Sequence, residues 1–431
     1  SAFYHDSACC LINDGEILAA VQEERFTRKK HDNSFPSNAI NYCLKEFNID
    51  SSKIDYVAFY DKPILKLERI LNTYLHYAPF GIRQFIKAMP LWMKRKIWTK
   101  EIIQKKLNYN GKILFPKHHE SHAASAFFPS PFKKSAFLTI DGAGEWNTTS
   151  YGVGEKNNLE TLANINFPHS LGLLYSAFTY FLGFKVNSGE YKVMGLAPYG
   201  QPKYKNIIYK NLIDVKEDGS FRMNMDYFDY CKGLKMTNNN FSQIFGAPPR
   251  KPESKLTQND MDIARSIQEV TEEIVLKIAT HVKNVTGMDN LCLAGGVALN
   301  SVANGKLLKT RIFDNIWIQP AAGDAGGAIG AALAVWYQYL SNERIVDENS
   351  DSMKGCFLGP QFSNDEIKKF LDKNNLEYAK VSNEEIPEKI SDILNEGKIV
   401  GWHYGKMEFG PRALGARSIL ADARSPKMQE I

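Results

Sequence analysis

Hydrophobic and polar residues alternate along the chain with two different periods, which together predict a mixed α/β protein. Short apolar runs bounded by turn-forming residues predict strands, and apolar positions spaced three and four apart predict helices. The predicted strands cover 54–60, 135–140, 151–154, 161–167, 290–293, 315–319 and 399–403. The predicted helices cover 37–48, 171–182, 261–285, 364–374 and 385–396. Near the N-terminus, the sequence Asn13-Asp14-Gly15 between two apolar runs predicts a β-hairpin.

The length of the chain and its polar breaks predict more than one domain. A chain of 431 residues exceeds what one hydrophobic core usually organises. The polar stretch 341–353 predicts a boundary, so we expect domains at 1–345 and 354–431. Within the first domain, 65–106 is basic and aromatic and is typical of a surface helical insertion, with a partner-binding or membrane-surface helix as the alternative. The polar segment 201–258 predicts a variable excursion or lid.

Composition narrows the class of protein. The chain is 44% hydrophobic and 23% charged, which is ordinary for a globular protein. Its 53 basic and 48 acidic residues give a net charge of +5, which is too small to indicate nucleic-acid binding. No apolar run is long enough for a membrane span, and six scattered cysteines without a C-x-x-C pair indicate a reducing compartment. We therefore expect a cytoplasmic protein with neither a nucleic-acid nor a membrane partner.

The most informative stretch is 117–145, KHHESHAASAFFPSPFKKSAFLTIDGAGE. Prolines before and after its first part predict a helix there, and this helix would place His118 and His122 one turn apart on a single face. Two imidazoles in this arrangement can hold one metal ion. His119 lies three residues before His122 and could compete as a ligand. Two packed histidines without any metal are the alternative.

A carboxylate follows the histidine pair at the end of the predicted strand 135–140. The strand would deliver Asp141 into a loop, where it could complete a set of two histidines and one carboxylate. Such a set with open positions suits iron(II), or zinc in a catalytic site.

Two glycine-rich turns each lie between a predicted strand and a predicted helix. AGGVALN contains Gly295 and Gly296, and GDAGGA contains Asp324. Glycines let the backbone approach a ligand, and a helix N-terminus offers N–H groups to a phosphate. Two such turns in succession indicate a nucleotide-binding α/β domain. Asp324 is a fourth candidate metal ligand, with a helix N-cap as the alternative.

Three other polar segments are candidate ligand contacts. These are the start of the N-terminal hairpin, the loop predicted at 189–200, and a turn at Gly415 between two arginines. The side chains concerned are His5, Asp6, Glu190, Lys192, Arg412 and Arg417. Paired arginines can grip phosphate or carboxylate. A capping turn, a rigid connector and surface arginines are the respective alternatives.

Five stretches, in order over nearly the whole chain, together resemble the O-carbamoyltransferases of the nodulation-factor and antibiotic-tailoring type. They are AFYHDSA with EERFTRKKHD, HHESHA with TIDGAGE, GEYKVMGLAPYG, LAGGVALN with GDAGGA, and MEFGPRALGARSIL. The resemblance implies a duplicated actin-like, Hsp70-like ATPase fold, followed by the start of a YrdC-like α/β domain. It also implies that carbamoyl phosphate and ATP form carbamoyl adenylate, from which the carbamoyl group passes to a hydroxyl of a small-molecule acceptor.

The resemblance also assigns roles to the residues named above. The metal ligands would be His118, His122, Asp141 and Asp324, binding iron(II) or zinc. The adenosine and phosphate of ATP would lie against Gly295, Gly296, Asn300 and Gly323, with magnesium as a further cofactor. The carbamoyl adenylate or the acceptor would contact Lys30, Glu190 and Lys192, while Arg412 and Arg417 would open the carbamoyl-phosphate domain. The base that takes the acceptor's proton would be His5 or Asp6.

In the resembling family the chain continues well beyond the GPRALG motif. The resemblance therefore implies that most of the YrdC-like domain is absent, and that these residues alone would not complete the first half-reaction. Two other functions stay open: a tRNA threonylcarbamoyl transferase-like enzyme, and a nucleotide-binding module without catalysis. The histidine pair argues against the last, because binding nucleotide through magnesium requires no imidazole. The oligomeric state is open, a homodimer included.

Overall fold

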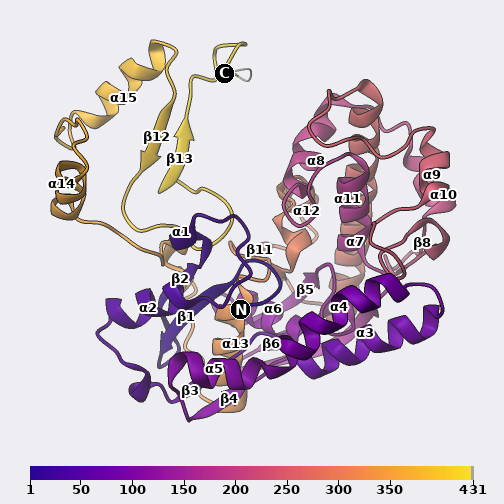
Figure 1. The fold of residues 1–431 in the computed structure, drawn as a ribbon, viewed down its shortest axis with the longest axis horizontal. Coiled ribbons are helices and arrows are strands. Elements are labelled where there is room, and N and C mark those ends of the chain that lie inside the picture. Colours follow the sequence, from indigo (N-terminus) through magenta and orange to yellow (C-terminus); the bar gives the residue numbers. More distant parts are fainter. Residues whose placement is uncertain (429–431) are drawn as a thin grey trace.

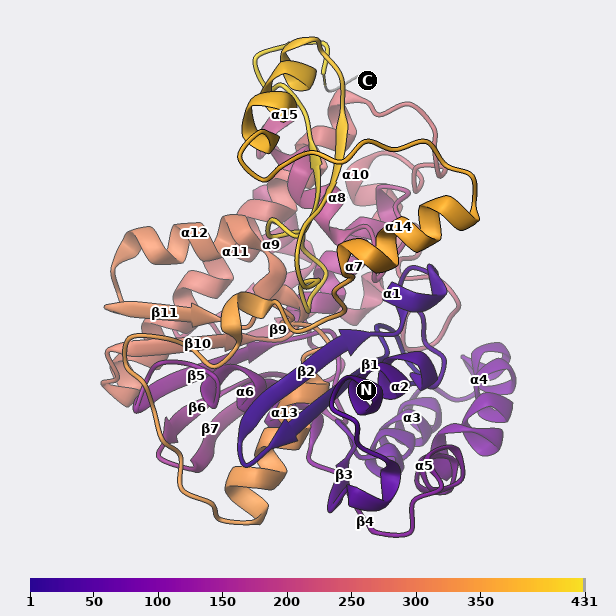
Figure 2. The same cartoon turned by 90° about the vertical axis from the view of Figure 1, so that its left-hand side faces the viewer.

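A mixed five-stranded sheet forms the centre of the molecule (Figures 1 and 2), and the computed structural model describes residues 1–428. Its strand order is β11-β10-β5-β6-β7. β5, β6 and β7 form an antiparallel meander, whereas β10 and β11 run parallel to β5. The strands are β5 (Lys134–Ile140), β6 (Asn147–Glu155), β7 (Asn158–Asn166), β10 (Asn290–Ala294) and β11 (Asn315–Ile318). Their parallel members bring three chain segments to one edge of the sheet.

The N-terminal part contains two small sheets. β1 (Ala8–Asn13) and β2 (Glu16–Gln22) form the hairpin that the Asn-Asp-Gly turn predicts. β3 (Tyr56–Ala58) and β4 (Lys112–Leu114) pair in parallel. The mixed α/β class is thus confirmed. Antiparallel strands followed by parallel strands occur in this N-terminal part and again in the large sheet. In the N-terminal part, however, these strands form two separate sheets. The duplicated actin-like fold therefore stays a prediction.

Two helices made of small residues cross closely beside the large sheet. α6 (His118–Phe127) is the helix predicted for the histidine pair, and nine of its ten residues are buried. It packs against α13 (Gly327–Ala334). At the crossing, a Cβ on Gly330 would lie only 1.7 Å from the carbonyl oxygen of Ser121, so the helices approach as closely as their backbones allow. This contact fixes the position of the histidines.

Three helices lie between β3 and β4, in the region where the sequence predicts a helical insertion at 65–106. They are α3 (Pro63–Tyr77), α4 (Ile82–Lys94) and α5 (Thr99–Leu107). The remaining helices of the N-terminal part are α1 (Glu24–Thr27) and α2 (Ser37–Glu46).

The prediction of a loop at 189–200 is wrong. The segment forms α8 (Glu190–Leu196) and a 3₁₀ turn, Ala197–Tyr199. Its helical state has a tertiary origin, because Val193 and Leu196 are buried in the largest hydrophobic cluster. The glycines that suggested a loop lie at its ends and on its outer side.

The segment 201–258 contributes side chains to the hydrophobic core, whereas a lid would lie outside the core. Eight of its apolar residues are fully or almost fully buried in the largest cluster, namely Ile208, Leu212, Ile213, Phe221, Met223, Phe228, Phe241 and Phe245. It carries α9 (Lys205–Asn211), β8 (Ile213–Val215), β9 (Phe221–Met223) and α10 (Asn239–Phe245). These elements pack around α7 (Leu171–Phe181) and the long α11 (Gln258–Thr286), and α12 (Ser301–Thr310) lies beside α11.

The C-terminal part extends away from the rest of the molecule (Figure 1). It comprises α14 (Asn364–Lys373), α15 (Ile386–Asn395), β12 (Val400–His403) and β13 (Arg417–Leu420), and neither helix has a buried residue. Phe409 anchors it, since its ring is buried and its N–H donates to Cys356 O. The domains at 1–345 and 354–431 and the YrdC-like assignment stay predictions, and the last three residues of the second range lie outside the described residues.

Two observations bear on the environment of the protein. Among residues 1–428, no helix is both long and apolar enough to cross a membrane. All six cysteines are free thiols. The cytoplasmic location stays a prediction.

The close crossing of α6 and α13 predicts a specific sensitivity to one methyl group. Gly330→Ala should lower the free energy of unfolding by about 1–3 kcal/mol or more, because the new Cβ overlaps the Ser121 carbonyl. Gly305→Ala on α12 is the matched control: its Cβ meets nothing within 4 Å, so it should stabilise the helix by about 0.5–1 kcal/mol. Urea unfolding of both variants measures the difference, and equal stabilities would contradict the packing described.

Candidate functional site

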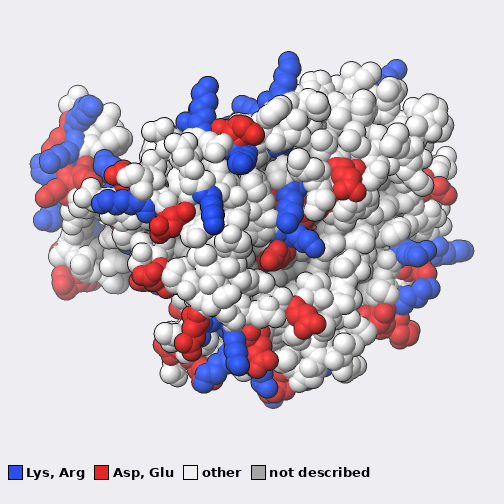
Figure 3. Space-filling model, turned by 90° about the horizontal axis from the view of Figure 1, so that it is seen from below, with Lys and Arg blue, Asp and Glu red and all other residues white. Residues whose placement is uncertain are grey.

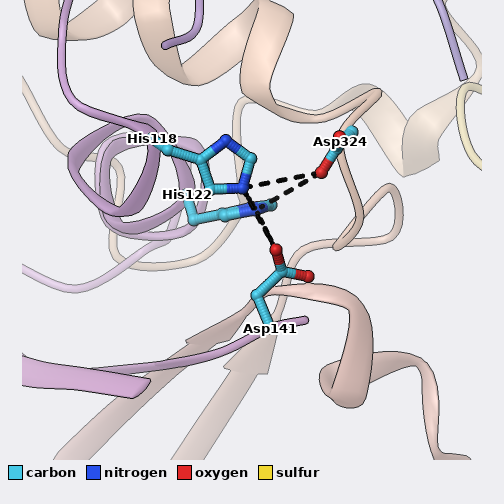
Figure 4. Close-up of side chains that lie close together, drawn as sticks. All are labelled: His118, His122, Asp141 and Asp324. Carbon is cyan, nitrogen blue, oxygen red and sulfur yellow. Dashed lines mark hydrogen bonds and ion pairs between the residues drawn. The ribbon is translucent and has the colours of Figure 1, made fainter. Parts of the chain in front are cut away.

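Four side chains from three chain segments converge on one point (Figure 4). His118 Nε2 lies 3.1 Å from Asp141 Oδ2, 3.1 Å from His122 Nε2 and 3.6 Å from Asp324 Oδ1. His122 Nε2 lies 3.8 Å from Asp141 Oδ2 and 3.9 Å from Asp324 Oδ1. One ligand atom from each residue therefore falls within 4.8 Å of all the others. The structure brings together all four residues that the sequence predicts as metal ligands.

The chemistry of this donor set fits a divalent metal ion. Bonds of about 2.0–2.2 Å to one ion place neighbouring ligand atoms about 3–4 Å apart, as they are here. Two imidazole nitrogens facing each other at 3.1 Å need a proton or a cation between them. Two carboxylates within the same buried cluster add negative charge that a cation offsets. Two histidines with two carboxylates suit iron(II) or zinc rather than calcium, which takes oxygen ligands.

The sheet edge explains how residues so far apart in sequence meet. Asp141 follows β5 and Asp324 follows β11, and these strands are parallel to β10, so all three carboxyl ends lie at one edge. Asp141 Oδ1 accepts a hydrogen bond from the backbone N–H of Gly296, at 2.9 Å. The Tyr60 hydroxyl donates to Asp324 Oδ2, at 3.2 Å. Each carboxylate thus keeps its other oxygen free for the shared point.

The turn after β10 requires glycine at one position. Gly295 has φ of +88°, and a Cβ there would lie 2.3 Å from the carbonyl oxygen of Ile140. Its N–H donates to Ala322 O at 2.8 Å, which joins the two glycine-rich turns. The turn therefore lies directly against the residue that precedes Asp141.

Glu145 holds the start of α6 in place, a role that sequence reasoning missed although Glu145 ends the TIDGAGE stretch that carries the resemblance. Its carboxylate accepts hydrogen bonds from the backbone N–H of His118, at 3.0 and 3.1 Å, and from the backbone N–H of Lys62, at 2.8 Å. A negative charge at a helix N-terminus is favourable. Because Lys62 precedes α3, this one side chain ties the insertion to the helix that carries the histidines.

His119 points away from the four-ligand cluster. Its Nδ1 lies 3.0 Å from Thr139 Oγ1 and 2.9 Å from Ser150 Oγ, both on the large sheet. Burial lowers the pKa of His119 well below its ordinary value, so the imidazole is neutral. The competition between His119 and His118 that the sequence left open is therefore decided by the sheet hydroxyls.

The predicted base candidates lie beside the cluster. His5 Nε2 is 3.7 Å from Asp324 Oδ2, and its Nδ1 is 2.8 Å from Asp6 Oδ2. The other oxygen of Asp6 is 2.8 Å from His31 Nδ1. Burial opposes ionisation of Asp6, but the hydrogen bonds from His31 and His5 outweigh it and lower the pKa of Asp6 below its ordinary value. Asp6 is therefore a carboxylate between two histidines.

Lys30 belongs to a second polar group next to these residues. Its Nζ lies 3.1 Å from Glu24 Oε1, and Glu24 Oε2 accepts from the N–H of His31 at 2.8 Å. Asp6, Glu24 and His31 also place ligand atoms within 4.8 Å of one another. Sequence reasoning missed Glu24 and His31, although both lie in the EERFTRKKHD stretch that carries the resemblance.

The candidate nucleotide contacts lie around the turn after β10. The side-chain amides of Asn300 and Gln268 exchange two hydrogen bonds at 2.9 and 3.0 Å, so Asn300 is held by α11. Gly323 faces open space, because a Cβ at this position would meet only Leu299 Cδ1, at 4.0 Å. Arg412 Nη2 donates to Leu299 O at 3.1 Å. The C-terminal motif thus reaches the glycine-rich turns.

Glu190 and Lys192 lie on α8, away from the four-ligand cluster. Glu190 accepts from the Ser176 hydroxyl at 2.8 Å, and the Lys192 Nζ lies 5.8 Å from the centre of the Phe184 ring. The Arg412 guanidinium lies 6.0 Å from the ring of Tyr191, between these two residues in sequence. Their predicted roles stay predictions.

Arg417, which is partly exposed, forms an ion pair with the buried Glu408. Its Nε donates to Glu408 Oε2 at 2.7 Å, and Glu408 also accepts from the N–H groups of Leu414 and Ala416. Burial opposes ionisation, but these hydrogen bonds lower the pKa of Glu408 from 4.5 to about 2. Arg417 therefore shapes the GPRALG segment in this structure, while Arg412 has its guanidinium directed to the turn.

Taken together, the fold and the site define a mixed α/β protein with a buried candidate metal centre at the carboxyl ends of three parallel strands. Residues 1–333 match the family model described as carbamoyltransferase N-terminus, and 391–431 match carbamoyltransferase C-terminus. The chain therefore belongs to the carbamoyltransferase family. This confirms the family resemblance and the predicted class of enzyme, a transferase.

Three relatives illustrate the similarity. An uncharacterised protein of Synechocystis is 58% identical over 100% of this chain and 72% of its own length. Nodulation protein NolNO of Sinorhizobium fredii is 35% identical over 98% of this chain and 59% of its own. Nodulation protein NolO of Bradyrhizobium diazoefficiens is 37% identical over 71% and 53%. Because the chain spans little more than half of the nodulation proteins, the reaction, its donor and its acceptor are proposals.

Glu145 and Glu120 both accept hydrogen bonds from backbone N–H groups at the start of α6, but removing them should affect stability and metal binding differently. Glu145→Ala should lower the free energy of unfolding by about 1–3 kcal/mol, because two backbone N–H groups lose a buried acceptor. It should also weaken metal binding by about tenfold. Glu120→Ala is the control, since Glu120 only accepts from the exposed N–H of Lys117, and should cost about 0.5 kcal/mol.

Denaturant unfolding and titration with zinc measure both effects. If the two variants bound zinc equally well, Glu145 would be an ordinary helix cap without influence on the ligands.

Proposed function

We propose that this chain carries the transfer site of an O-carbamoyltransferase, which moves a carbamoyl group from carbamoyl phosphate, through ATP-derived carbamoyl adenylate, to a hydroxyl of a small molecule or sugar. The observation that carries the proposal is the four-ligand cluster lying next to the two glycine-rich turns. A metal centre and a glycine-rich turn at one end of the sheet would supply the charge stabilisation and the phosphate contacts for transfer from a mixed carbamoyl–phosphate anhydride. Membership of the carbamoyltransferase family supports the same conclusion.

The four ligands would hold iron(II) or zinc, which would polarise the carbamoyl oxygen when bound. The chain's own residues would supply the remaining parts. We propose His5 as the base, because its Nδ1 is fixed by Asp6 while its Nε2 faces the cluster. Burial opposes its protonation, but Asp324 and Asp6 outweigh burial and raise the pKa of His5 to about 9. Only the deprotonated form of His5 would therefore take the acceptor's hydroxyl proton as the new C–O bond forms. The bond between the carbamoyl carbon and the phosphate oxygen would break, and AMP would leave.

The nucleotide would lie between the two turns. Gly295 and Gly296 would let the backbone approach the phosphates, Asn300 would be oriented by Gln268, and Gly323 would leave room opposite. Arg412, which already contacts the turn, would face the phosphate charge. Lys30, Glu190 and Lys192 are proposed to contact the carbamoyl adenylate or the acceptor. Arg417 would lie in a YrdC-like domain that makes the carbamoyl adenylate. Its ion pair with Glu408 would hold the GPRALG segment in place.

The proposal predicts that the two half-reactions can be separated by one substitution. With the full-length protein, carbamoyl phosphate should lose inorganic phosphate to water, and the carbamate so formed should displace pyrophosphate from ATP, so pyrophosphate release should depend on carbamoyl phosphate. AMP should follow as carbamoyl passes to an acceptor or, slowly, to water. Asp324→Asn should slow AMP formation by about 100-fold or more, because one ligand charge is lost, while pyrophosphate release continues. Asp314→Asn, at the exposed opposite end of β11, is the matched control.

Coupled assays for pyrophosphate and AMP measure the two steps. AMP formation at the wild-type rate in Asp324→Asn would contradict the assignment of the site. Pyrophosphate release that does not depend on carbamoyl phosphate would contradict carbamoyl phosphate as the donor and would favour a threonylcarbamoyl transferase-like enzyme. The absence of any pyrophosphate release would favour a nucleotide-binding module without catalysis.

A further inference from the structure

The α3–α4 hairpin, residues 63–100, exposes many large apolar side chains within a short segment. Of 29 large hydrophobic side chains that are exposed among residues 1–428, nine lie in this short segment. They are Ile64, Leu71, Leu75, Phe80, Ile82, Ile86, Leu91, Met93 and Trp98. The view from below shows a broad face with few charged side chains on the side where α3 and α4 lie (Figure 3). Such a concentration marks a surface that binds something apolar.

Helix α4 has three distinct faces. One is covered by the protein and includes the buried Trp92. A second is an exposed apolar stripe of Ile82, Ile86 and Met93, which are 59%, 64% and 55% exposed and recur at helical spacing. A third, next to the stripe, is formed by the exposed cations Arg83, Lys87 and Lys94. An apolar stripe flanked by cations is the pattern of a helix that lies in a membrane interface.

Charge is equally concentrated in the hairpin. Residues 63–100 contain eight Lys or Arg and one Glu, a net charge of +7, whereas the whole chain carries +5. The remaining residues therefore carry −2 in total. The hairpin alone is strongly basic, and anionic phospholipids attract such a segment.

We propose that the α3–α4 hairpin docks the protein on an anionic phospholipid surface. Helix α4 would lie in the plane of the interface, with Ile82, Ile86 and Met93 among the acyl chains and its cations against the lipid phosphates. This contact is peripheral and needs no spanning helix. It replaces the expectation of no membrane partner with the membrane-surface helix that the sequence offered as an alternative for 65–106.

A second copy of the chain fits this surface less well. A symmetric dimer would place the same patch of each copy against the other, so the +7 hairpins would face and repel each other. The C-terminal part does not cover the hairpin, since α14 and α15 lie on the opposite side of the molecule (Figure 1). An anionic phospholipid membrane offers acyl chains to the apolar stripe and phosphates to the cations.

The hairpin is also joined to the candidate site. Lys66 of α3 pairs with Asp61 at 2.6 Å and lies 5.6 Å from the ring centre of Tyr60, whose hydroxyl donates to Asp324. Docking would bring the candidate site close to the lipid surface, where an amphiphilic hydroxyl acceptor could reach it. This consequence, unlike the docking itself, rests on the proposed function.

Co-sedimentation with vesicles tests the docking. The protein should bind vesicles of phosphatidylglycerol mixed with phosphatidylcholine, and binding should fall as salt is raised. Ile86→Glu and Met93→Glu should each weaken binding by about tenfold or more, and Lys87→Glu by about fivefold. Leu308→Glu and Lys309→Glu on α12, exposed positions with an aliphatic and a cationic side chain, are the matched controls and should bind like the wild type.

Circular dichroism verifies that every variant is folded. If the α12 controls weaken vesicle binding as much as the α4 variants do, the proposal is overturned. It is also overturned if the wild type does not bind anionic vesicles. Sedimentation that shows a dimer in solution, dissociated by Ile86→Glu, would assign the surface to a second copy instead.

Discussion

Two carboxylates buried against two imidazoles are the constraint on which the rest of the structure depends. The side chains of Asp324 and Asp141 are 3% and 13% exposed, and His118 and His122 are 1% exposed. Removing such charges from water is costly unless they are paired or bind a metal. The nearby cation Lys66 does not balance them, because it already pairs with Asp61. A bound cation, as proposed above, or a protonated imidazole would offset this charge.

The surrounding fold is built to hold this arrangement. α6 and α13 consist mostly of Ala, Ser, Gly and His, so their backbones cross in contact and leave the histidines little freedom. Asp141 and Asp324 stand at the ends of parallel strands, where a sheet offers several chain segments at one edge. Glu145 then links the start of α6 to the insertion. The same insertion presents the basic, apolar surface to solvent, so the site and that surface share one scaffold.

Much of the site could be predicted because its ligands lie in short, locally encoded elements. The i, i+4 spacing of His118 and His122 needs only a helix, and Asp141 and Asp324 follow apolar runs that become strands. What escaped prediction depends on contacts between distant segments. The loop expected at 189–200 is helical because Val193 and Leu196 find a core elsewhere in the chain. Glu145 and His31 act through hydrogen bonds that follow no sequence period.

The C-terminal part shows the same limit. Its helices and its first strand follow from local pattern, but the pairing of Arg417 with Glu408 does not, because a polar side chain gives no local sign of its partner. The duplicated fold and the YrdC-like domain came from the resemblance alone and stay predictions.

Metal content tests the central claim most directly. Protein purified without chelator should carry about one iron or zinc per chain by elemental analysis, and His118→Ala should lose it. His119→Ala, which removes the neighbouring imidazole that faces the sheet, should retain it. A metal-free wild type, or the same metal content in His118→Ala as in the wild type, would contradict the account.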